Sequence, residues 1–369
     1  MQPWIETLKI EQFRALRNLE INRIGRVNLI TGLNNSGKSS VLEAVRLLAS
    51  GASPTVISEI LRFREEDIEE QDNGESYFPF ASLFHGFPGL TFDLNPIRIW
   101  SEKSGIKNLN VALSVGWYLE ERDFDGSRKY VPVSQALFNI SDGFPMLEID
   151  RGDTKIPIPF DSGKFRFRGR HMRSDFANGV GLPCEFVSPY GGARTANLGQ
   201  LWDKIALSDR ESDVIQALQI IDQDIKAVSM VGGERPREHR TAIVRSKNLQ
   251  VPVPLRSFGD GLNRLFGIIL SLVNSKDGLL LIDEFENGLH HSVQSNIWRT
   301  IFKISRNLNI QVLATTHSWD AIETFQEVAC EEQDEGVLIR LTRRGEEIIP
   351  TVFTEDELAI ATRDKIEVR

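Results

Sequence analysis

The chain has 369 residues, 41% of them hydrophobic and 26% charged, which is ordinary for a globular protein with one large domain or two intermediate ones. No run of about 18 apolar residues and no secretory signal is present, and two cysteines do not make a disulfide framework, so we expect a cytoplasmic protein with no membrane partner. The net charge of -9 argues against nucleic acid as a partner of the whole molecule, although a local basic patch would be compatible with one.

Residues 5–48 are predicted to form two strands and a turn, followed by a third strand, a glycine-containing loop and a helix. The loop, GLNNSGKS at 32–39, matches the phosphate-binding pattern G-x-x-x-x-G-K-[ST]. The apolar VNLI before it and the helical spacing of VLEAVRLLA after it supply the context that this pattern requires, whereas a structural glycine turn is the alternative. The predicted nucleotide-binding residues are Gly32, Asn34, Asn35, Ser36, Gly37, Lys38, Ser39 and Ser40.

The residue types of this loop suit phosphate chemistry. Gly32 and Gly37 allow the backbone N–H groups to point inward at phosphate oxygens, and the following helix adds its positive N-terminal end. Lys38 is expected to reach the β and γ phosphates, and the hydroxyl of Ser39 is expected to bind Mg²⁺.

The middle of the chain predicts a β-rich lobe. An acidic, helix-like segment covers about 52–76, and strand signals separated by turn residues dominate 77–190, so we interpret this region as an antiparallel lobe inserted into the nucleotide fold. Apolar spacing over 197–230 predicts one or two helices, and 238–256 returns to short strands. From 257 onward helix and strand alternate, as expected for a parallel sheet covered on both faces.

Two further apolar strands each end in polar residues. LLLIDEFENGLHH at 279–291 ends its strand in Asp283, which would deliver a carboxylate to the Mg²⁺ side of the phosphates, and in Glu284, which would act as general base on the attacking water. VLATTHS at 312–318 ends in His317, placed to sense the terminal phosphate. A solvent-facing turn and a structural histidine are the alternatives for these features.

A second small-residue turn precedes a helix in LRSFGDGLNRLFGIILSL at 255–272. Such a turn is an anion-binding element, and one chain does not need two of them for one γ phosphate. We therefore predict that Ser257, Gly259 and Gly261 complete the site of another subunit.

Together these motifs resemble, in order and spacing, the ABC-type ATPases of the SMC and RecF kind, and most closely the OLD-like ATPases, often described only as AAA-type, of phage-defence and plasmid systems. The resemblance implies an α/β fold, a P-loop ABC-type ATPase with a mixed or parallel sheet flanked by helices. It places a discontinuous ATPase core at 1–50 and 185–369, with a helical insert at about 197–230. The remainder, 51–184, is then the mainly β lobe with its acidic segment.

For this sequence the resemblance implies a head-to-tail homodimer, or a higher even oligomer, that binds ATP and Mg²⁺. Lys38, Ser39, Asp283 and Glu284 would hold the nucleotide on one subunit, while the partner's signature turn would close over the γ phosphate. His317 would be the switch histidine, and preference for adenine is likewise implied. The SFGDG turn departs from the LSGGQ of transporters, and His290 stands where many relatives have Asp.

Several charged groups have two interpretations. A basic strand and a second cluster either form solvated surfaces or contact a DNA backbone; their residues are Arg166, Arg168, Arg170, Arg235, Arg237, Arg240 and Arg245. Glu286, His290 and His291 do not have the order of a zinc motif. Asp123 and Asp125 lie in a turn-like segment, and too few residues follow His317 for a Toprim nuclease domain, so no second catalytic centre is expected.

The leading functional hypothesis is an ATP-hydrolysing switch that controls a separate effector, such as a nuclease, in phage defence. The first alternative is a RecF-like DNA-repair ATPase that binds duplex DNA directly. A transporter ATPase subunit is a weaker alternative, because the signature is not LSGGQ and the β insertion is large.

Overall fold

The computed structural model describes most of the chain in detail. The described residues are 3–66, 78, 80–89, 94–102, 109–122, 128–133, 143–152, 154–159, 181–189, 195–232, 240–332, 335–353 and 357. Among them, no helix is long and apolar enough to cross a membrane.

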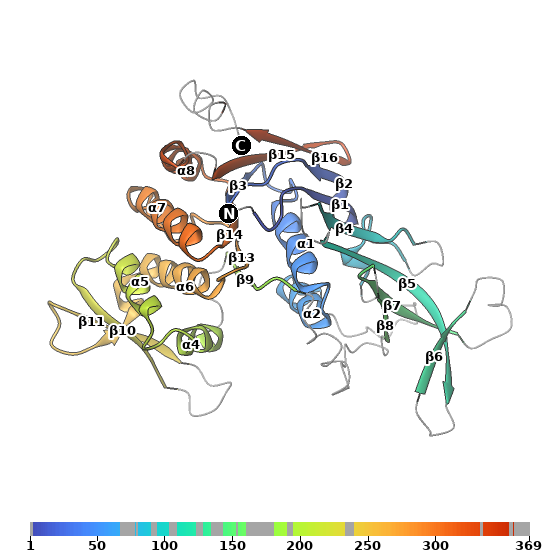
Figure 1. Ribbon diagram of the computed structural model, residues 1–369, viewed down its shortest axis with the longest axis horizontal. Coiled ribbons are helices and arrows are strands. Elements are labelled where there is room, and N and C mark those ends of the chain that lie inside the picture. Colours follow the sequence, from blue (N-terminus) through green and yellow to red (C-terminus); the bar gives the residue numbers. More distant parts are fainter. Residues whose placement is uncertain are drawn as a thin grey trace.

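A six-stranded sheet forms the centre of the molecule (Figure 1). Its strands, in spatial order, are β16 (Glu347–Phe353), β15 (Gly336–Arg344), β3 (Val27–Thr31), β14 (Gln311–Thr315), β13 (Leu279–Ile282) and β9 (Cys184–Val187). All neighbouring pairs are parallel except β15 and β16. Every residue of β3, β13 and β14 is buried, because helices cover both faces of a parallel sheet, and this explains the continuous apolar runs in the sequence.

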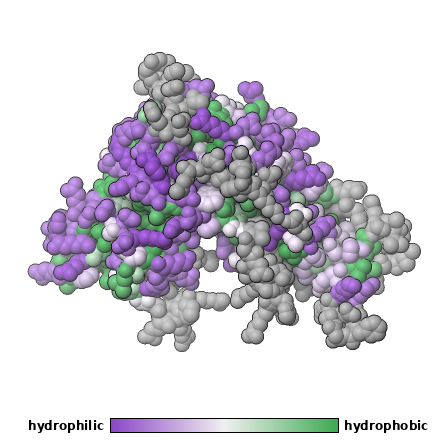
Figure 2. Space-filling view, in the orientation of Figure 1, coloured by the Kyte–Doolittle hydropathy of each residue, from purple (hydrophilic) through white to green (hydrophobic). Residues whose placement is uncertain are grey.

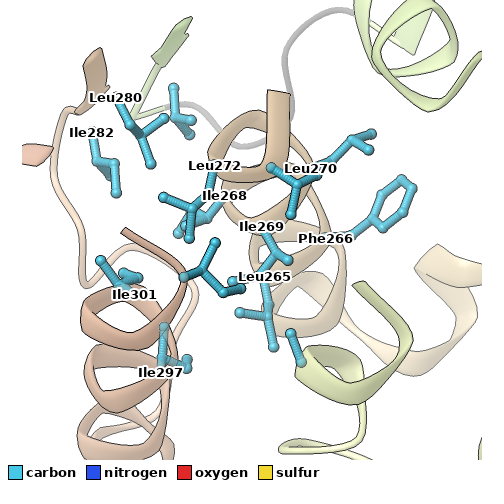
Figure 3. Packing of buried hydrophobic residues seen from close by; sticks show 14 of the residues in the cluster. Leu265, Phe266, Ile268, Ile269, Leu270, Leu272, Leu280, Ile282, Ile297 and Ile301 are labelled. Atoms are coloured by element: carbon cyan, nitrogen blue, oxygen red, sulfur yellow. The ribbon is translucent and has the colours of Figure 1, made fainter. Parts of the chain in front are cut away.

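Helices on the two faces of this sheet belong to different hydrophobic cores. Alternate residues of β13 point to opposite faces, so Leu280 and Ile282 join one core while Leu279 and Leu281 join the other. The first core contains α6 (Asp260–Asn274), α7 (His291–Asn307) and α8 (Trp319–Glu331), and Figure 3 shows α6 and α7 packing around β13. The second core contains α1 (Lys38–Ser50) and α2 (Pro54–Phe63).

A seven-stranded antiparallel sheet lies beside α1 and α2 (Figure 1). Its strands are β1 (Leu8–Phe13), β2 (Leu16–Ile21), β4 (Ile97–Ser101), β5 (Leu109–Arg122), β6 (Arg128–Pro132), β7 (Phe144–Asp150) and β8 (Lys155–Pro159), and η1 (Ala81–Leu83) packs near its start. Because β1 pairs with β4, this sheet contains strands from both sides of residue 50, the position at which the sequence had suggested a domain boundary. The KFRFR strand predicted at 164–168 lies outside the described residues, as do residues 67–77 of the acidic segment.

Between β9 and α6 the chain forms a smaller unit that packs on α6. It contains α4 (Thr195–Asp203), α5 (Asp209–Leu218), a three-stranded sheet of β10 (Ile225–Val231), β11 (Thr241–Ser246) and β12 (Val253–Pro254), and then η3 (Leu255–Phe258). The prediction of helix up to residue 230 was wrong at its end, because residues 225–231 form β10, which pairs with β11 and buries residues on one face. Figure 2 shows a mainly hydrophilic face, with small hydrophobic areas over this unit.

Candidate functional site

The predicted phosphate loop joins β3 to α1, and its glycines are required by close packing. Gly32 has φ 147°, and a Cβ there would lie 2.5 Å from the carbonyl oxygen of Leu341 and 2.6 Å from Oγ of Ser36. Gly37 has φ 89° as the N-cap of α1, and a Cβ there would lie 2.9 Å from side chains of Leu16 and Ile348. Larger residues would therefore distort the loop at both positions.

Lys38 lies at the end of this loop, folded back onto its backbone. Its Nζ donates hydrogen bonds to the carbonyl oxygens of Gly32 at 2.7 Å and Leu33 at 3.0 Å. Burial lowers the pKa of Lys38, while the carboxylates of Asp283, Glu286 and Glu284 act in the opposite direction. The ammonium group is thus a partly desolvated cation in the field of the strand-end carboxylates, and a phosphate group would replace two carbonyl oxygens as its partner.

The predicted Mg²⁺ ligands come together although they are 244 residues apart in the sequence. Oγ of Ser39 donates to Oδ1 of Asp283 at 3.2 Å, and Oγ1 of Thr315 donates to the same oxygen at 2.6 Å. Asp283 is only 4% exposed. A hydroxyl and a carboxylate beside a phosphate loop are the hard oxygen donors that Mg²⁺ takes from protein when phosphates and water complete its shell, so Ser39 and Asp283 fit this ion.

Glu284 follows Asp283 in a left-handed turn with φ 50°. This turn sends the next side chain, Phe285, into the core, where its ring stacks on Trp298 at a centroid distance of 3.9 Å. The carboxylate of Glu284 remains at the strand end and accepts a hydrogen bond from Nδ2 of Asn287 at 2.5 Å. The proposed base therefore has a defined position.

Arg264 is a site residue that the sequence analysis missed. It lies on α6, is 2% exposed, and donates to the carbonyl oxygens of Asp283 at 2.8 Å and Glu284 at 3.0 Å, as well as to that of Ser188. Burial lowers its pKa to about 10, against the effect of the nearby carboxylates. The sequence did contain a signal for it, since Arg264 is a single arginine within the apolar helix LNRLFGIILSL. A charge buried in such a helix needs hydrogen-bond partners from elsewhere in the fold.

His317 lies just beyond the end of β14, where it contacts Glu286. Its backbone N–H donates to Oε1 of Glu286 at 3.0 Å, and its Nδ1 lies 3.1 Å from the same oxygen. The side chain of His317 is 50% exposed, whereas that of Glu286 is 10% exposed. The loop after β13 and the end of β14 are thus joined beside the phosphate loop.

The signature turn leads into α6, which packs on the opposite face of the central sheet from α1. Ser257 and Gly259 are exposed, and a Cβ on Gly259 would meet open space, although its φ of 99° favours glycine. Gly261 is different, because a Cβ there would lie 2.7 Å from the carbonyl oxygen of Gly288. Within the described ranges, no hydrogen bond or ion pair joins Ser257 or Gly259 to residues 32–40.

The basic clusters are only partly described. Arg240 donates to Oδ2 of Asp203 at 2.6 Å and to the carbonyl oxygens of Gly199 and Met230, so it joins α4 to β10. Arg245 is exposed on β11. The other predicted basic residues and the acidic pair at 123 and 125 lie outside the described residues: Arg166, Arg168, Arg170, Arg235, Arg237, Asp123 and Asp125.

Comparison with known proteins gives matches to AAA domains in two separate regions of the chain. Residues 194–322 match a family described as "AAA domain, putative AbiEii toxin, Type IV TA system", and residues 7–85 match an AAA domain. An "ATP/GTP phosphatase" of Helicobacter pylori is 26% identical over 93% of this chain and 96% of its own length. The RecF protein of Caldanaerobacter subterraneus is 40% identical over 65 residues, which are 17% of this chain and 18% of RecF.

Solved structures with the same fold include SMC heads. A head bound to the C-winged helix domain of ScpA aligns over 95% of this chain and 98% of its own, with a TM-score of 0.51 and 12% identity. A head bound to the C-terminal domain of ScpA, from Pyrococcus furiosus, aligns over 99% of this chain and over its own full length. Its TM-score is 0.51 and its sequence identity is 11%. With the phosphate loop and the Asp283–Glu284 strand end, the AAA-domain matches and the similarity to the ATP/GTP phosphatase identify the chain as a P-loop ATPase of the ABC type, with the fold of the SMC heads and a local similarity to RecF.

Proposed function

We propose that this ATPase is a switch that closes as a head-to-tail homodimer around ATP and Mg²⁺ and controls a separate effector protein. The observation that carries the proposal is the division of the ATPase motifs. The phosphate loop and the ends of β13 and β14 converge in one chain, whereas Ser257 and Gly259 of the signature turn are exposed and, within the described ranges, make no hydrogen bond to residues 32–40. An exposed anion-binding turn at a helix N-terminus suits a phosphate supplied by another molecule.

In this proposal each side chain has a separate role. Lys38 neutralises the β and γ phosphates, and Ser39 and Asp283 hold Mg²⁺, which lowers the charge that the attacking water must approach. Glu284 accepts a proton from that water, and His317 contacts the terminal phosphate. Ser257 and Gly259 of the second subunit complete the same site, so hydrolysis requires a closed dimer.

A mixing experiment tests whether the site is shared between subunits. Lys38→Ala removes the phosphate cation, and Ser257→Arg places a bulky side chain on the exposed signature turn; each variant alone is expected to be inactive. A mixed dimer of the two has one site with both defects and one intact site. An equal mixture, reassembled at random, should therefore recover about a quarter of the parental hydrolysis rate, because half of the dimers are mixed.

The matched control mixes Lys38→Ala with Glu284→Gln. Both changes lie on the same side of the shared site, so every site in this mixed dimer carries one defect and no activity should return. Recovery in the first mixture alone supports the head-to-tail arrangement. Failure of the first mixture to recover, with both variants folded and able to exchange subunits, would contradict it.

We further propose that the effector is encoded separately and that the pair acts in phage defence. The match of residues 194–322 to a family described as a putative AbiEii toxin of a type IV toxin–antitoxin system supports this role, as does the OLD-like order of motifs. The test is to trap the Glu284→Gln variant with ATP and identify the proteins that bind it but do not bind Lys38→Ala. A partner specific for the trapped form supports effector control, and none in the native host would contradict it.

Direct action on duplex DNA is a second candidate function, favoured by the 40% identity with RecF over 65 residues. Steady-state hydrolysis with and without duplex DNA, at low and high salt, separates the two. Salt-sensitive stimulation would favour a DNA clamp, because phosphate contacts release counterions and weaken steeply with salt. A slow rate that does not respond to DNA would favour the protein-controlled switch.

A further inference from the structure

We infer that Glu286 is a positioning residue for His317, fixing which imidazole nitrogen faces the nucleotide. The inference rests on the proposed role of His317 at the terminal phosphate and extends it to a carboxylate that neither binds Mg²⁺ nor acts as the base. Three features of the chain carry it: the turn that places Glu286, its two contacts with His317, and its burial.

The turn after β13 determines where Glu286 lies. Glu284 adopts φ 50°, and Phe285 then inserts into the core against Trp298, with an interplanar angle of 22°. The backbone N–H of Phe285 also donates to the carbonyl oxygen of Thr315 at 2.9 Å, which ties the turn to the end of β14. Glu286, the next residue, is therefore held beside the residues that follow β14.

The contacts between Glu286 and His317 indicate which nitrogen of the imidazole ring carries the proton. Oε1 of Glu286 accepts the backbone N–H of His317 at 3.0 Å and lies 3.1 Å from Nδ1. An ionised carboxylate can only accept hydrogen bonds, so the closeness of Oε1 to Nδ1 favours the neutral imidazole that carries its proton on Nδ1. Nε2 is then the nitrogen left to contact the water or a phosphate oxygen, and the backbone contact fixes the start of the segment that carries the ring.

The Glu286 side chain is largely buried, although a glutamate with no role in the fold or the site would be expected to face solvent. The Glu286 side chain is 10% exposed, and in the described part of the chain its second oxygen, Oε2, is buried without a hydrogen-bond partner. Leaving a buried carboxylate oxygen unsatisfied is unfavourable, and a glutamate that served only as a surface group would turn outward. Glu286 therefore keeps its contact with His317 although its Oε2 is left unsatisfied.

Glu286 also acts electrostatically on Lys38 and Arg264. An effect of removing Glu286 could therefore arise through these cations and not through His317. Its charge acts to raise the pKa of Lys38 and of Arg264, opposing the lowering by burial. If Glu286 acted mainly through Lys38, its removal would change ATP binding. If it acts through His317, its removal lowers kcat and leaves ATP binding unchanged.

A double-mutant cycle distinguishes these explanations. Glu286→Ala should lower kcat roughly 10- to 100-fold, as expected for loss of a charge-assisted hydrogen bond that orients a catalytic group, with unchanged ATP affinity. Glu286→Gln keeps an acceptor oxygen and should retain more activity than Glu286→Ala. In a His317→Ala background, Glu286→Ala should have no further effect on kcat, because the residue that it positions is absent.

Controls keep folding separate from catalysis. Thermal unfolding and binding of a non-hydrolysable ATP analogue are measured for every variant, and Glu346→Ala, at a side chain 81% exposed, is the matched glutamate control. If Glu286→Ala does not fold, the cycle is run with Glu286→Gln. An equal loss of kcat in both backgrounds, or a loss of analogue binding, would overturn the inference alone. Parental kcat in His317→Ala would remove the proposed role of His317 as well.

Discussion

The hydroxyl of Thr315 donates to Oδ1 of Asp283 at 2.6 Å and accepts the backbone N–H of Glu284 at 2.9 Å. One buried side chain on β14 therefore fixes both the direction of the carboxylate at the end of β13 and the first peptide of the turn that carries the base. Ser39 reaches the same carboxylate oxygen from α1. The proposed Mg²⁺ side of the site is thus held by hydrogen bonds between three elements distant in sequence.

Thr315→Val should weaken this arrangement without changing the shape of the side chain. It removes a donor and an acceptor and leaves the partly buried N–H of Glu284 without this partner, which should lower the free energy of unfolding by about 1–3 kcal/mol. ATP hydrolysis should fall as well. Urea denaturation and steady-state assays check this, with Thr315→Ser as the control that keeps the hydroxyl; equal losses in both variants would assign the effect to packing.

Lys38→Ala should abolish most ATP binding. Charge-assisted hydrogen bonds are each worth about 1.5–3 kcal/mol, so losing one to each of two phosphates should weaken affinity about 100- to 10,000-fold. Titration calorimetry with ATP and Mg²⁺ measures the change. Lys276→Ala, at an exposed lysine before β13, is the matched control and should bind normally. Unchanged affinity in Lys38→Ala would contradict the placement of the phosphates.

Glu284→Gln should separate binding from hydrolysis. The amide cannot accept a proton from water, so kcat should fall about 100- to 10,000-fold while ATP still binds. Because the products that open the dimer no longer form, the variant should accumulate as a dimer, which light scattering after size-exclusion chromatography detects. Turnover at the parental rate would show that another group is the base.

Glu43→Gln should destabilise the protein strongly. Oε2 of Glu43 lies 2.6 Å from Nε of Arg14, and its Oε1 lies 2.6 Å from Nε of Arg64, so this buried carboxylate on α1 pairs with two arginines. Removing its charge leaves Arg64 without this partner and Arg14 with Glu66 as its remaining carboxylate, and should cost about 3–5 kcal/mol of unfolding free energy. The control is Glu59→Gln, whose side chain is 51% exposed and pairs with Arg46; its effect should be below about 1 kcal/mol.

Glu148 should make stability depend on pH in the acidic range. Burial raises its pKa, but hydrogen bonds from Lys155, Tyr118 and Ser114 outweigh that effect and leave the pKa below its ordinary value of 4.5. A depressed folded-state pKa stabilises the fold above the unfolded value, and this contribution is lost as pH falls through the folded value.

The difference in unfolding free energy between the parent and Glu148→Gln should therefore be largest near neutral pH and should shrink once pH falls below about 4.5. Urea denaturation across this range, with calorimetric confirmation that unfolding remains two-state, measures it. A difference that is constant with pH would show that shape, and not charge, carries the contribution of Glu148.

Much of the site could be predicted because its signals are local. The phosphate loop has positive φ angles and close contacts at Gly32 and Gly37, where glycine is favoured. Asp283 follows an apolar run that had to be a buried strand. By contrast, Arg264 on α6 and Glu286 after β13 gained their roles only through contacts with distant residues, and no spacing in the sequence marks those contacts.

Local signals in the sequence were enough to predict a strand, a glycine loop and a helix that suit phosphate, and to predict that Asp283 and His317 would follow apolar strands. These features follow from backbone conformation and side-chain periodicity, which each segment carries within itself. The tertiary structure alone decided that Ser39 meets Asp283, that β1 pairs with β4, and that Glu286 holds His317. Those contacts join segments far apart in the chain, and which segments meet is set by the competition among all possible packings of the whole chain.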